Sequence, residues 1–335
     1  MPGSFLPGQC TRVYETNRLI GAFLFKVSQL RLHGVELFFV LSGFLITGIL
    51  LDSKKSSKYF TTFYARRFLR IFPLYYFVLF ISFFILPKLY TVDPAGIEVI
   101  DKQAWLWTYT QNISWLWGKG GWDASLNFPS FGHFWSLCVE EHFYLLWPLL
   151  VWISGEKWLP RVMWSIALLS ALSVLFVYSF GDAVPILKWS TIRCAGVLSL
   201  GGLIAWYKRK PDKFIKISHL AIRLVWPAGL LFFLVNFIPR KYEIYEVATF
   251  FTSVTFFILL MTVSLRGNRI TDKLFNHKIL YFIGKISYGI YVYHGLLRPF
   301  LKAYVYDGFI SQISNGIISS IIYTILCTVI SVSIA

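Results

Sequence analysis

Charged residues and clustered cysteines are scarce in this chain. Only 14% of its 335 residues are charged and 56% are hydrophobic, whereas soluble domains contain about 25% charged residues. This composition excludes an ordinary soluble domain and predicts a polytopic membrane protein. The cysteines are isolated in the sequence, which excludes a disulfide framework and zinc-ligand spacing, so we expect no metal and no bound cofactor. They are Cys10, Cys138, Cys194 and Cys327.

We also predict no cleavable signal peptide, because Met1 to Arg18 has no basic start followed by an apolar core. The formal net charge is +16, which in a soluble protein would suggest a nucleic-acid partner. Here the positive charges lie in short connections between apolar runs. We therefore expect the lipid bilayer as a partner and no nucleic acid.

Apolar runs long enough to span a bilayer occur nine times. They cover residues 35–51, 71–90, 141–154, 162–180, 189–207, 219–238, 245–265, 279–297 and 314–335. The sequence thus predicts an all-α transmembrane bundle of about nine spans. Alternate connections differ in lysine and arginine, with 17 in one set and 8 in the other. The richer set is predicted to be cytoplasmic.

The long connection at residues 87–141 falls on the other, outer side. It contains five tryptophans, Trp105, Trp107, Trp115, Trp117 and Trp122. Tryptophan is enriched at membrane interfaces. We expect a re-entrant or interfacial segment, or one that covers a cavity.

The segment from His133 to Pro148 places four ionisable side chains beside an apolar run. A charged group in the bilayer core costs about 3 kcal/mol or more, so a polar helix face should turn toward a bundle interior or a wet cavity. Glu140 or Glu141 with His133 is a candidate acid/base pair. The alternative is two interfacial carboxylates that stabilise the helix N-terminus. The polar face is predicted from spacings of three and four residues: His133, Ser136, Glu140, Tyr144 and Trp147.

A second pattern begins at Gly34, where Glu36 sits a few residues inside an apolar run. Glu36 is either a pocket residue or an interfacial carboxylate. Ser42 and Gly43 form a small pair that permits close approach of a ligand or close helix packing.

The third pattern is basic. Arg66 and Arg70 are four residues apart and Arg67 and Arg70 are three apart, so their guanidinium groups share one helix flank. Arginine donates bidentately to oxyanions, which makes phosphate a candidate ligand. The alternative is a cytoplasmic anchor that contacts lipid phosphate.

The fourth pattern follows spacings of four, three and four through Ser287, Tyr291, His294 and Arg298. These side chains share a helix face in the outer half of the predicted bundle. His294 is a candidate catalytic residue, and the alternative is a hydrogen-bonded packing histidine.

Four segments resemble the acyltransferase 3 family of membrane O-acyltransferases. They are GVELFFVLSGFLIT at 34–47, RRFLRIFPLYY at 66–76, HFWSLCVEEHFYLLWPLL at 133–150 and SYGIYVYH at 287–294. The resemblance extends over about residues 34–335. It implies roughly ten membrane helices and acyl-CoA, usually acetyl-CoA, as the donor. It assigns Arg67 and Arg70 to an Arg-x-x-Arg motif, Glu140 to the carboxylate of Trp-Ser-Leu-x-x-Glu, and His133 to the histidine before that tryptophan.

The N-terminus departs from the family. Members open with a helix that carries an arginine and, about eleven residues later, a histidine proposed as the catalytic base. Here Arg18 is followed by Gln29 at that position, and Lys26 interrupts the apolar stretch. We expect residues 1–33 to be a degenerate segment before a transmembrane domain at 34–335.

The resemblance implies transfer of an acyl group, with acetyl the first choice, from acyl-CoA to a hydroxyl of an exported or cell-surface carbohydrate. Such acceptors include polysaccharide, lipopolysaccharide and peptidoglycan. The implied location is a bacterial inner membrane. The alternatives are a transporter or flippase for a glycan or lipid-linked substrate, and an inactive family fragment. The expected catalytic residues are Glu140, His133, Glu141 and His294, and Arg66, Arg67 and Arg70 are expected to hold the donor. The expected substrate pocket contains Glu36, Ser42, Gly43, Trp135, Ser136, Tyr144, Ser287 and Tyr291.

Overall fold

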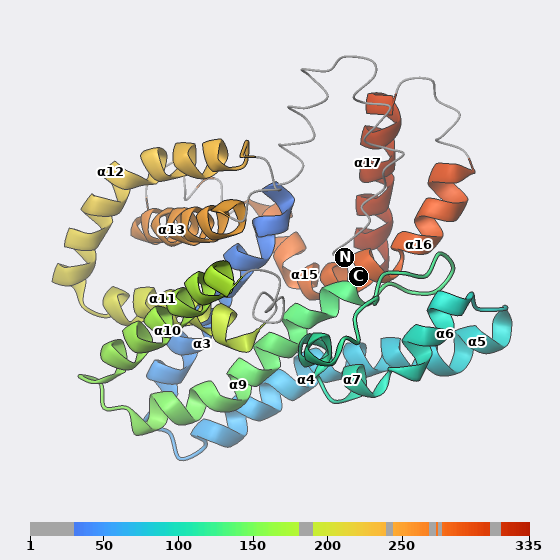
Figure 1. Cartoon of the computed structure of the whole chain (residues 1–335). Coiled ribbons are helices and arrows are strands. Elements are labelled where there is room, and N and C mark those ends of the chain that lie inside the picture. Colours follow the sequence, from blue (N-terminus) through green and yellow to red (C-terminus); the bar gives the residue numbers. More distant parts are fainter. Residues whose placement is uncertain (1–29, 181–189, 239–243, 268–272, 274–276, 309–315) are drawn as a thin grey trace. The chain divides into compact units, whose positions relative to one another are not determined.

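The computed structural model describes residues 30–180, 190–238, 244–267, 273, 277–308 and 316–335 (Figure 1). All regular structure in these residues is helical, which confirms the all-α prediction. The long helices of this part are α3 (Gly34–Ser53), α4 (Tyr59–Phe80), α9 (Trp135–Ile153), α10 (Leu159–Phe180), α11 (Thr191–Lys208), α12 (Pro211–Val235), α13 (Ile244–Arg266), α15 (Lys278–Leu296) and α17 (Gly316–Ile334). Most of the segment 1–33 lies outside the described residues, so its expected character stays a prediction.

Short helices fill the connections. They are η1 (Leu30–His33), η2 (Ile81–Ile85), α5 (Leu86–Leu89), α6 (Pro94–Asp101), α7 (Ala104–Trp107), α8 (Gln111–Ser114), η3 (Trp115–Trp117), η4 (Gly132–Phe134), α16 (Arg298–Phe300) and η7 (Leu301–Asp307).

Each of the nine predicted apolar runs coincides with one long helix. Five helical stretches among the described residues are long and apolar enough to cross a membrane. They are Gly34–Ser53, Tyr59–Leu89, Leu159–Phe176, Pro211–Val235 and Ile244–Arg266. The chain is therefore an integral membrane protein, and the total of nine spans remains a prediction.

Several helices begin earlier than their apolar runs, and in two of these the added residues include predicted site residues. Helix α4 starts at Tyr59 and so contains the whole arginine cluster, and α9 starts at Trp135. Glu140 therefore lies in the second turn of α9. This excludes the interpretation of Glu140 as a capping residue, because the helix dipole acts on side chains in the first turn.

The chain divides into two compact units, and each is described by itself. Unit 1 contains Met1–Val27, Ala65–Trp135 and Phe275–Ala335. Unit 2 contains Ser28–Tyr64 and Ser136–Leu274. Helices α4 and α9 each continue from one unit into the other.

Unit 2 is built around the contact of α3 with α11, which α10 and α13 extend. Gly43 of α3 permits this contact, since a Cβ there would lie 1.8 Å from the carbonyl oxygen of Leu198. Gly201 does the same from the other side, at 2.1 Å from the oxygen of Val40. Small residues let membrane helices approach backbone to backbone. Gly43 is therefore a packing residue here, which was one of its two predicted roles.

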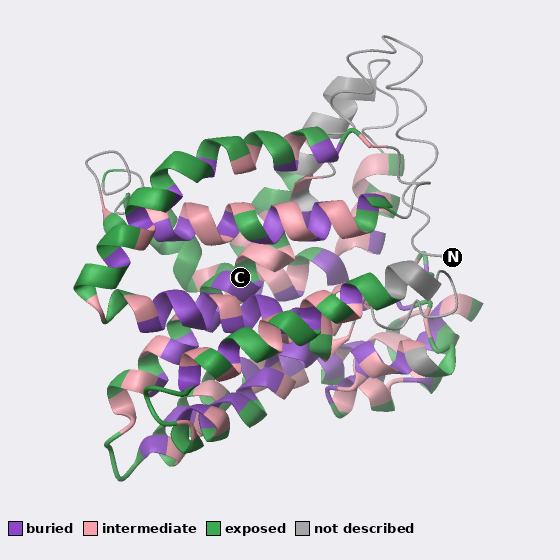
Figure 2. Ribbon diagram, turned by 60° about the vertical axis from the view of Figure 1, so that its left-hand side comes forward, coloured by how far each residue is buried: buried purple, intermediate pink, exposed green. Residues whose placement is uncertain are grey.

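Helix α12 lies beside α13 in the same unit (Figure 1). Many of its apolar side chains point away from that contact, and Leu230 and Leu231 remain 60% and 53% exposed. Buried and exposed residues alternate along the long helices (Figure 2). Exposed apolar faces of this kind suit a lipid environment and mark a membrane-facing surface.

Unit 1 has an aromatic core in which the connection 90–134 packs on α4. Tyr75 is fully buried, stacks on Tyr109 at 4.2 Å between ring centroids, and donates a hydrogen bond of 2.9 Å to the oxygen of Leu106. Trp122 is 1% exposed and donates to Ser114. Trp122 is therefore a core residue and not an interfacial one. Trp117, at 63% exposure, is the tryptophan whose placement suits an interface.

Asp93 lies at the start of α6 and contacts a later part of the connection 90–134. Its carboxylate accepts hydrogen bonds from the Gly96 N–H at 2.7 Å, the Ser125 hydroxyl at 2.7 Å and the Leu126 N–H at 2.8 Å. Partial burial raises the pKa of Asp93, but these bonds to the ionised form outweigh it and leave the pKa below its usual value. Asp93 thus links the start of α6 to residues 125–126 of the same connection.

Candidate functional site

Three oxygen atoms meet in the interior of unit 2, where α3 faces α9. The Ser42 hydroxyl donates to Oε1 of Glu140 at 2.6 Å and lies 2.7 Å from the hydroxyl of Tyr144. The Tyr144 hydroxyl donates to the same Oε1. All three residues are buried, and Glu140 is 4% exposed. The structure thus brings together three predicted site residues, and we call them the Glu140 triangle.

The Glu140 triangle has three close oxygen–oxygen contacts, and each needs a hydrogen. Ser42 and Tyr144 carry one hydroxyl hydrogen each, and an ionised carboxylate is an acceptor only. Two hydrogens cannot fill three contacts. With a neutral Glu140 all three contacts can be filled, provided that one of the two hydroxyl groups accepts from the carboxylic acid and donates to the other hydroxyl.

Further polar contacts fix α9 against its neighbours in unit 2. The Trp147 indole donates to Thr47 at 2.9 Å, one turn beyond Ser42 on α3. Tyr59 donates to the oxygen of Pro148 at 3.0 Å. Within unit 2, the predicted polar face of α9 is confirmed as a buried face by Ser136, Glu140, Tyr144 and Trp147.

Two acidic residues of unit 2 lie apart from the Glu140 triangle. Glu141 is half-buried on another face of α9. Glu36 is near the start of α3 and faces His33, with 3.9 Å between Oε2 and Nδ1. Two polar contacts of this unit were not predicted from the sequence. One is Thr47 with Trp147, and the other is His142, whose Nδ1 lies 2.9 Å from the Thr191 hydroxyl.

A histidine cluster occupies unit 1, where η4 meets α15. The rings of His133 and His294 are 4.9 Å apart, and the Tyr291 hydroxyl donates to the oxygen of His133 at 2.7 Å. The Nε2 atom of His133 lies 3.2 Å from the oxygen of Val292. Gly295 makes room for the imidazole, because a Cβ there would lie 2.2 Å from ring atoms of His133. The structure therefore joins two segments that are about 160 residues apart in sequence.

The remaining predicted residues of unit 1 are more open. Ser287 is exposed and bonds only within its own helix, to the oxygen of Gly284 at 2.9 Å. Trp135 is half-exposed at the start of α9. Arg66 and Arg70 are exposed on α4, where an oxyanion can reach them, and Arg67 is half-buried. Their role as a donor site stays a prediction.

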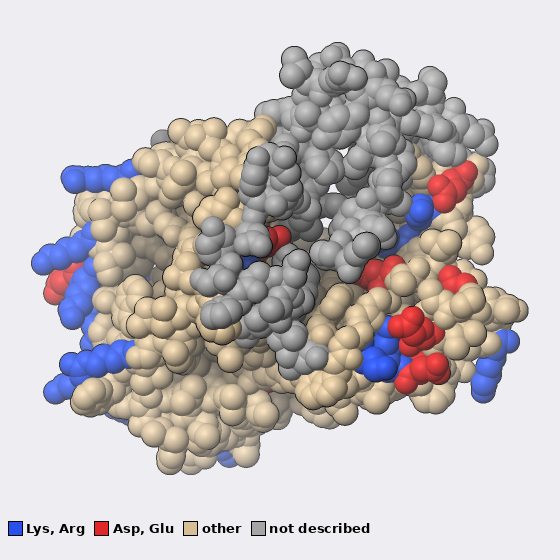
Figure 3. Space-filling model, viewed as in Figure 1, with Lys and Arg blue, Asp and Glu red and all other residues tan. Residues whose placement is uncertain are grey.

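Basic side chains also gather on unit 2, along one edge where α12 begins (Figure 3). Lys210 and Lys213 lie over the ring of Trp206, and Arg209 pairs with Asp52 at 2.6 Å. This edge carries the connection 207–218 that the charge count predicts to be cytoplasmic.

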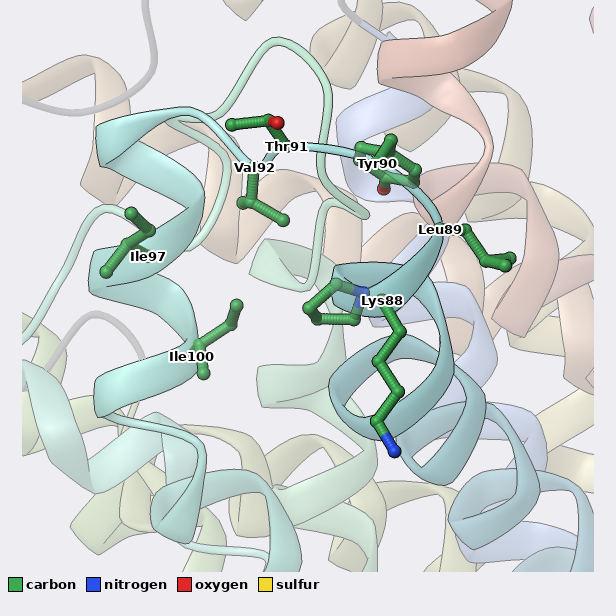
Figure 4. Close-up of a pocket in the computed structure, with 8 residues that line it drawn as sticks. Lys88, Leu89, Tyr90, Thr91, Val92, Ile97 and Ile100 are labelled. Atoms are coloured by element: carbon green, nitrogen blue, oxygen red, sulfur yellow. The ribbon is translucent and has the colours of Figure 1, made fainter.

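A separate groove lies in unit 1 between the end of α5 and α6, with Tyr90, Val92, Ile97 and Ile100 on its walls (Figure 4). None of the predicted site residues lines it. Its side chains are mostly apolar, and it carries no catalytic arrangement.

Comparison with known proteins identifies the class. The family model described as "Acyltransferase domain", of the acyltransferase 3 type, matches residues 13–335. The chain therefore belongs to the acyltransferase 3 family, as its motifs predicted. No solved structure matches this chain significantly.

Among its relatives is the peptidoglycan O-acetyltransferase OatA of Listeria monocytogenes, which is 29% identical over 78% of this chain and 44% of the relative. A candidate O-acetyltransferase of Staphylococcus aureus is 26% identical over 88% of this chain and 50% of the relative. A candidate peptidoglycan O-acetyltransferase of Bacillus subtilis is 28% identical over 78% and 43%. The chain spans about half the length of the curated relatives it matches.

Proposed function

We propose that this chain is the membrane part of an O-acyltransferase that moves an acetyl group onto a hydroxyl of a cell-wall glycan. Family membership and relatives named as peptidoglycan O-acetyltransferases support this assignment. The observation that carries it is the Glu140 triangle, which lies on the family motif and holds a buried carboxyl ready to exchange a proton.

The proposed donor is an acyl-CoA thioester, with Arg66, Arg67 and Arg70 as the phosphate ligands. Exposed arginines one turn apart suit phosphate oxygens because each guanidinium group donates two parallel hydrogen bonds. The proposed location is the inner membrane of a bacterium, with these arginines on the cytoplasmic side.

In the proposed step, the acceptor oxygen forms a bond to the acyl carbon while the bond from carbon to sulfur breaks. The Glu140 carboxyl gives its proton to the departing sulfur. It regains a proton from the acceptor hydroxyl through Ser42 or Tyr144, whose hydroxyl groups already bond to it. The carboxyl thus ends the cycle in the state in which it began.

The test is acetyl transfer by the purified chain in detergent, from labelled acetyl-CoA to a peptidoglycan oligosaccharide. We expect Glu140→Gln to lower the rate at least about 100-fold, the effect of losing a positioned acid/base group. The matched control is Glu156→Gln, which removes an exposed carboxylate that pairs with Lys210. It should retain the parent rate.

Two results would contradict the proposal. Transfer that survives Glu140→Gln at the parent rate would remove Glu140 from the chemistry. Movement of a glycan substrate across vesicles without release of CoA would identify a transporter instead.

A further inference from the structure

A second polar cluster lies in unit 2, where five helix ends meet away from the Glu140 triangle. His33 ends η1 and Glu36 lies in the first turn of α3. Asn236 closes the end of α12, Arg193 is in the first turn of α11, and Glu246 is in the first turn of α13. Neither the motifs nor the proposed reaction assigns a role to His33.

His33 and Glu36 face each other with unused hydrogen-bonding atoms. Their side chains are only 10% and 16% exposed, and 3.9 Å separates Nδ1 from Oε2. That separation is too long for a direct hydrogen bond. Both atoms are buried and neither has a hydrogen-bond partner among the described residues. Buried polar groups in native proteins almost always have a partner, so this pair calls for one.

The rest of the cluster fixes the direction of the His33 ring. Its side chain bonds to Asn236, which accepts a 3.3 Å bond from Tyr245 and donates a 2.8 Å bond to the oxygen of Phe232. The ring also packs edge-on against Phe232 at 5.1 Å. Nδ1 has no partner among the described residues, so the bond to Asn236 is assigned to Nε2. In the tautomer in which Nε2 donates that bond, Nδ1 presents a lone pair to Glu36.

Charge around the pair favours a neutral ligand. Burial lowers the pKa of His33 more than Glu36, Asn236 and Glu246 raise it, and Arg193 lowers it as well. The imidazole is therefore uncharged at neutral pH. The guanidinium group of Arg193, which lies over the ring of Phe250 at 4.6 Å, repels a positive charge at His33 and so disfavours a cation there.

We propose that His33 and Glu36 bind the sugar acceptor through two neighbouring donor groups, one hydrogen-bonded to each side chain. Adjacent hydroxyl groups of a sugar, or a hydroxyl beside an amide N–H, supply two donors on neighbouring atoms. Gly34, which follows His33 in the chain, is exposed, and a Cβ built there would meet no atom of the described residues within 4 Å.

The position of the pair on α3 fits this role, which rests on the proposed function. Glu36 and Ser42 are six residues apart on α3, which separates them by a rise of about 9 Å and by about 120° around the helix axis. One or two sugar rings span such a distance. The pair would thus hold one part of a glycan while another part reaches the Glu140 triangle of the same unit.

The test is binding of a tetrasaccharide of N-acetylglucosamine to the purified chain by titration calorimetry. We expect saturable binding that weakens about tenfold in Glu36→Gln and in His33→Phe, as loss of one hydrogen bond to a charged or buried group predicts. The control is Glu156→Gln, which removes an exposed carboxylate of the same unit that pairs with Lys210. Its affinity should stay within twofold of the parent. Equal affinity in all variants, or no binding by the parent chain, would overturn the proposal.

A footprinting measurement needs no substitution and covers variants that fail to fold. Carbodiimide labelling of carboxylates in the parent chain, read by mass spectrometry, should be weaker at Glu36 when the tetrasaccharide is present and unchanged at Glu156. Equal labelling of Glu36 with and without the saccharide would mean that only water bridges the pair, and would overturn the proposal.

Both measurements are independent of acyl transfer. A chain that binds without transferring refutes the proposed function alone, and one that transfers with unaltered acceptor KM in Glu36→Gln refutes this inference alone.

Discussion

The two units of this chain hold their helices together by different means. In unit 2, polar side chains bond across helix interfaces, as in the Glu140 triangle and the pair of Thr47 with Trp147, and glycines bring α3 against α11. In unit 1, aromatic rings stack between α4 and the connection 90–134, as Tyr75 does on Tyr109. Apolar packing gives little net drive between helices that are already in lipid, so close backbone contact and interhelical hydrogen bonds carry more of the association. Unit 2 follows that rule, whereas the core of unit 1 resembles that of a soluble protein.

The largest expected effect on stability is at the glycine contact of unit 2. Gly43→Ala places a methyl group on the Leu198 carbonyl oxygen, where the backbone of α11 cannot move aside. We expect a loss of about 1–3 kcal/mol or more, the usual range for overpacking, measured by thermal unfolding in detergent. Gly284→Ala is the matched control in unit 1, because a Cβ there meets no atom within 4 Å. If both variants unfold at the same temperature, the contact of α3 with α11 does not depend on glycine.

The next largest loss of stability is expected at the histidine cluster of unit 1. Gly295→Ala would push the His133 imidazole away from α15. A side chain can rotate more easily than a backbone can shift, so we expect a smaller loss than at Gly43, about 1 kcal/mol. The same thermal assay measures it. A loss larger than that of Gly43→Ala would show that the side-chain contact in unit 1 tolerates an added methyl group less well than the backbone contact in unit 2.

The smallest energetic effect concerns the hydrogen count in the Glu140 triangle. Ser42→Ala and Tyr144→Phe should show a coupling energy of about 0.5–1.5 kcal/mol in a double-mutant cycle of unfolding. Infrared difference spectra should contain the carbonyl band of a protonated carboxylic acid in the parent chain, and Glu140→Gln should remove it. A parent spectrum without that band would show that Glu140 is ionised.

The sequence predicted the helices well because each long apolar run has one counterpart in the structure. It placed the start of α9 too late, since the ionisable residues 140–142 interrupt the apolar pattern although they continue the helix. Periodicity also identified the buried face of α9. It could not name Ser42 as the partner of Glu140, because periodicity gives the direction of a face and not the helix that meets it.

The aromatic connection was the hardest part to foresee. A high tryptophan content suits both an interface and a core, and only the contacts of Trp122 show that it belongs to a core. The surroundings of His33 were similarly hidden, because apart from Glu36 its neighbours come from α11, α12 and α13, which are far from it in sequence.

Along helix α3, the number of residues between two side chains determines the directions in which they point. Glu36, Ser42 and Gly43 each meet a different neighbour, namely His33, Glu140 and Leu198. Adding or removing one residue between Glu36 and Ser42 would turn one end of the helix by about 100° relative to the other. The serine and the glycine would then leave their partners together, while the hydropathy of the helix would hardly change. Substitutions along α3 can therefore be tolerated one at a time, but a change in its length between these residues would misalign every contact at once.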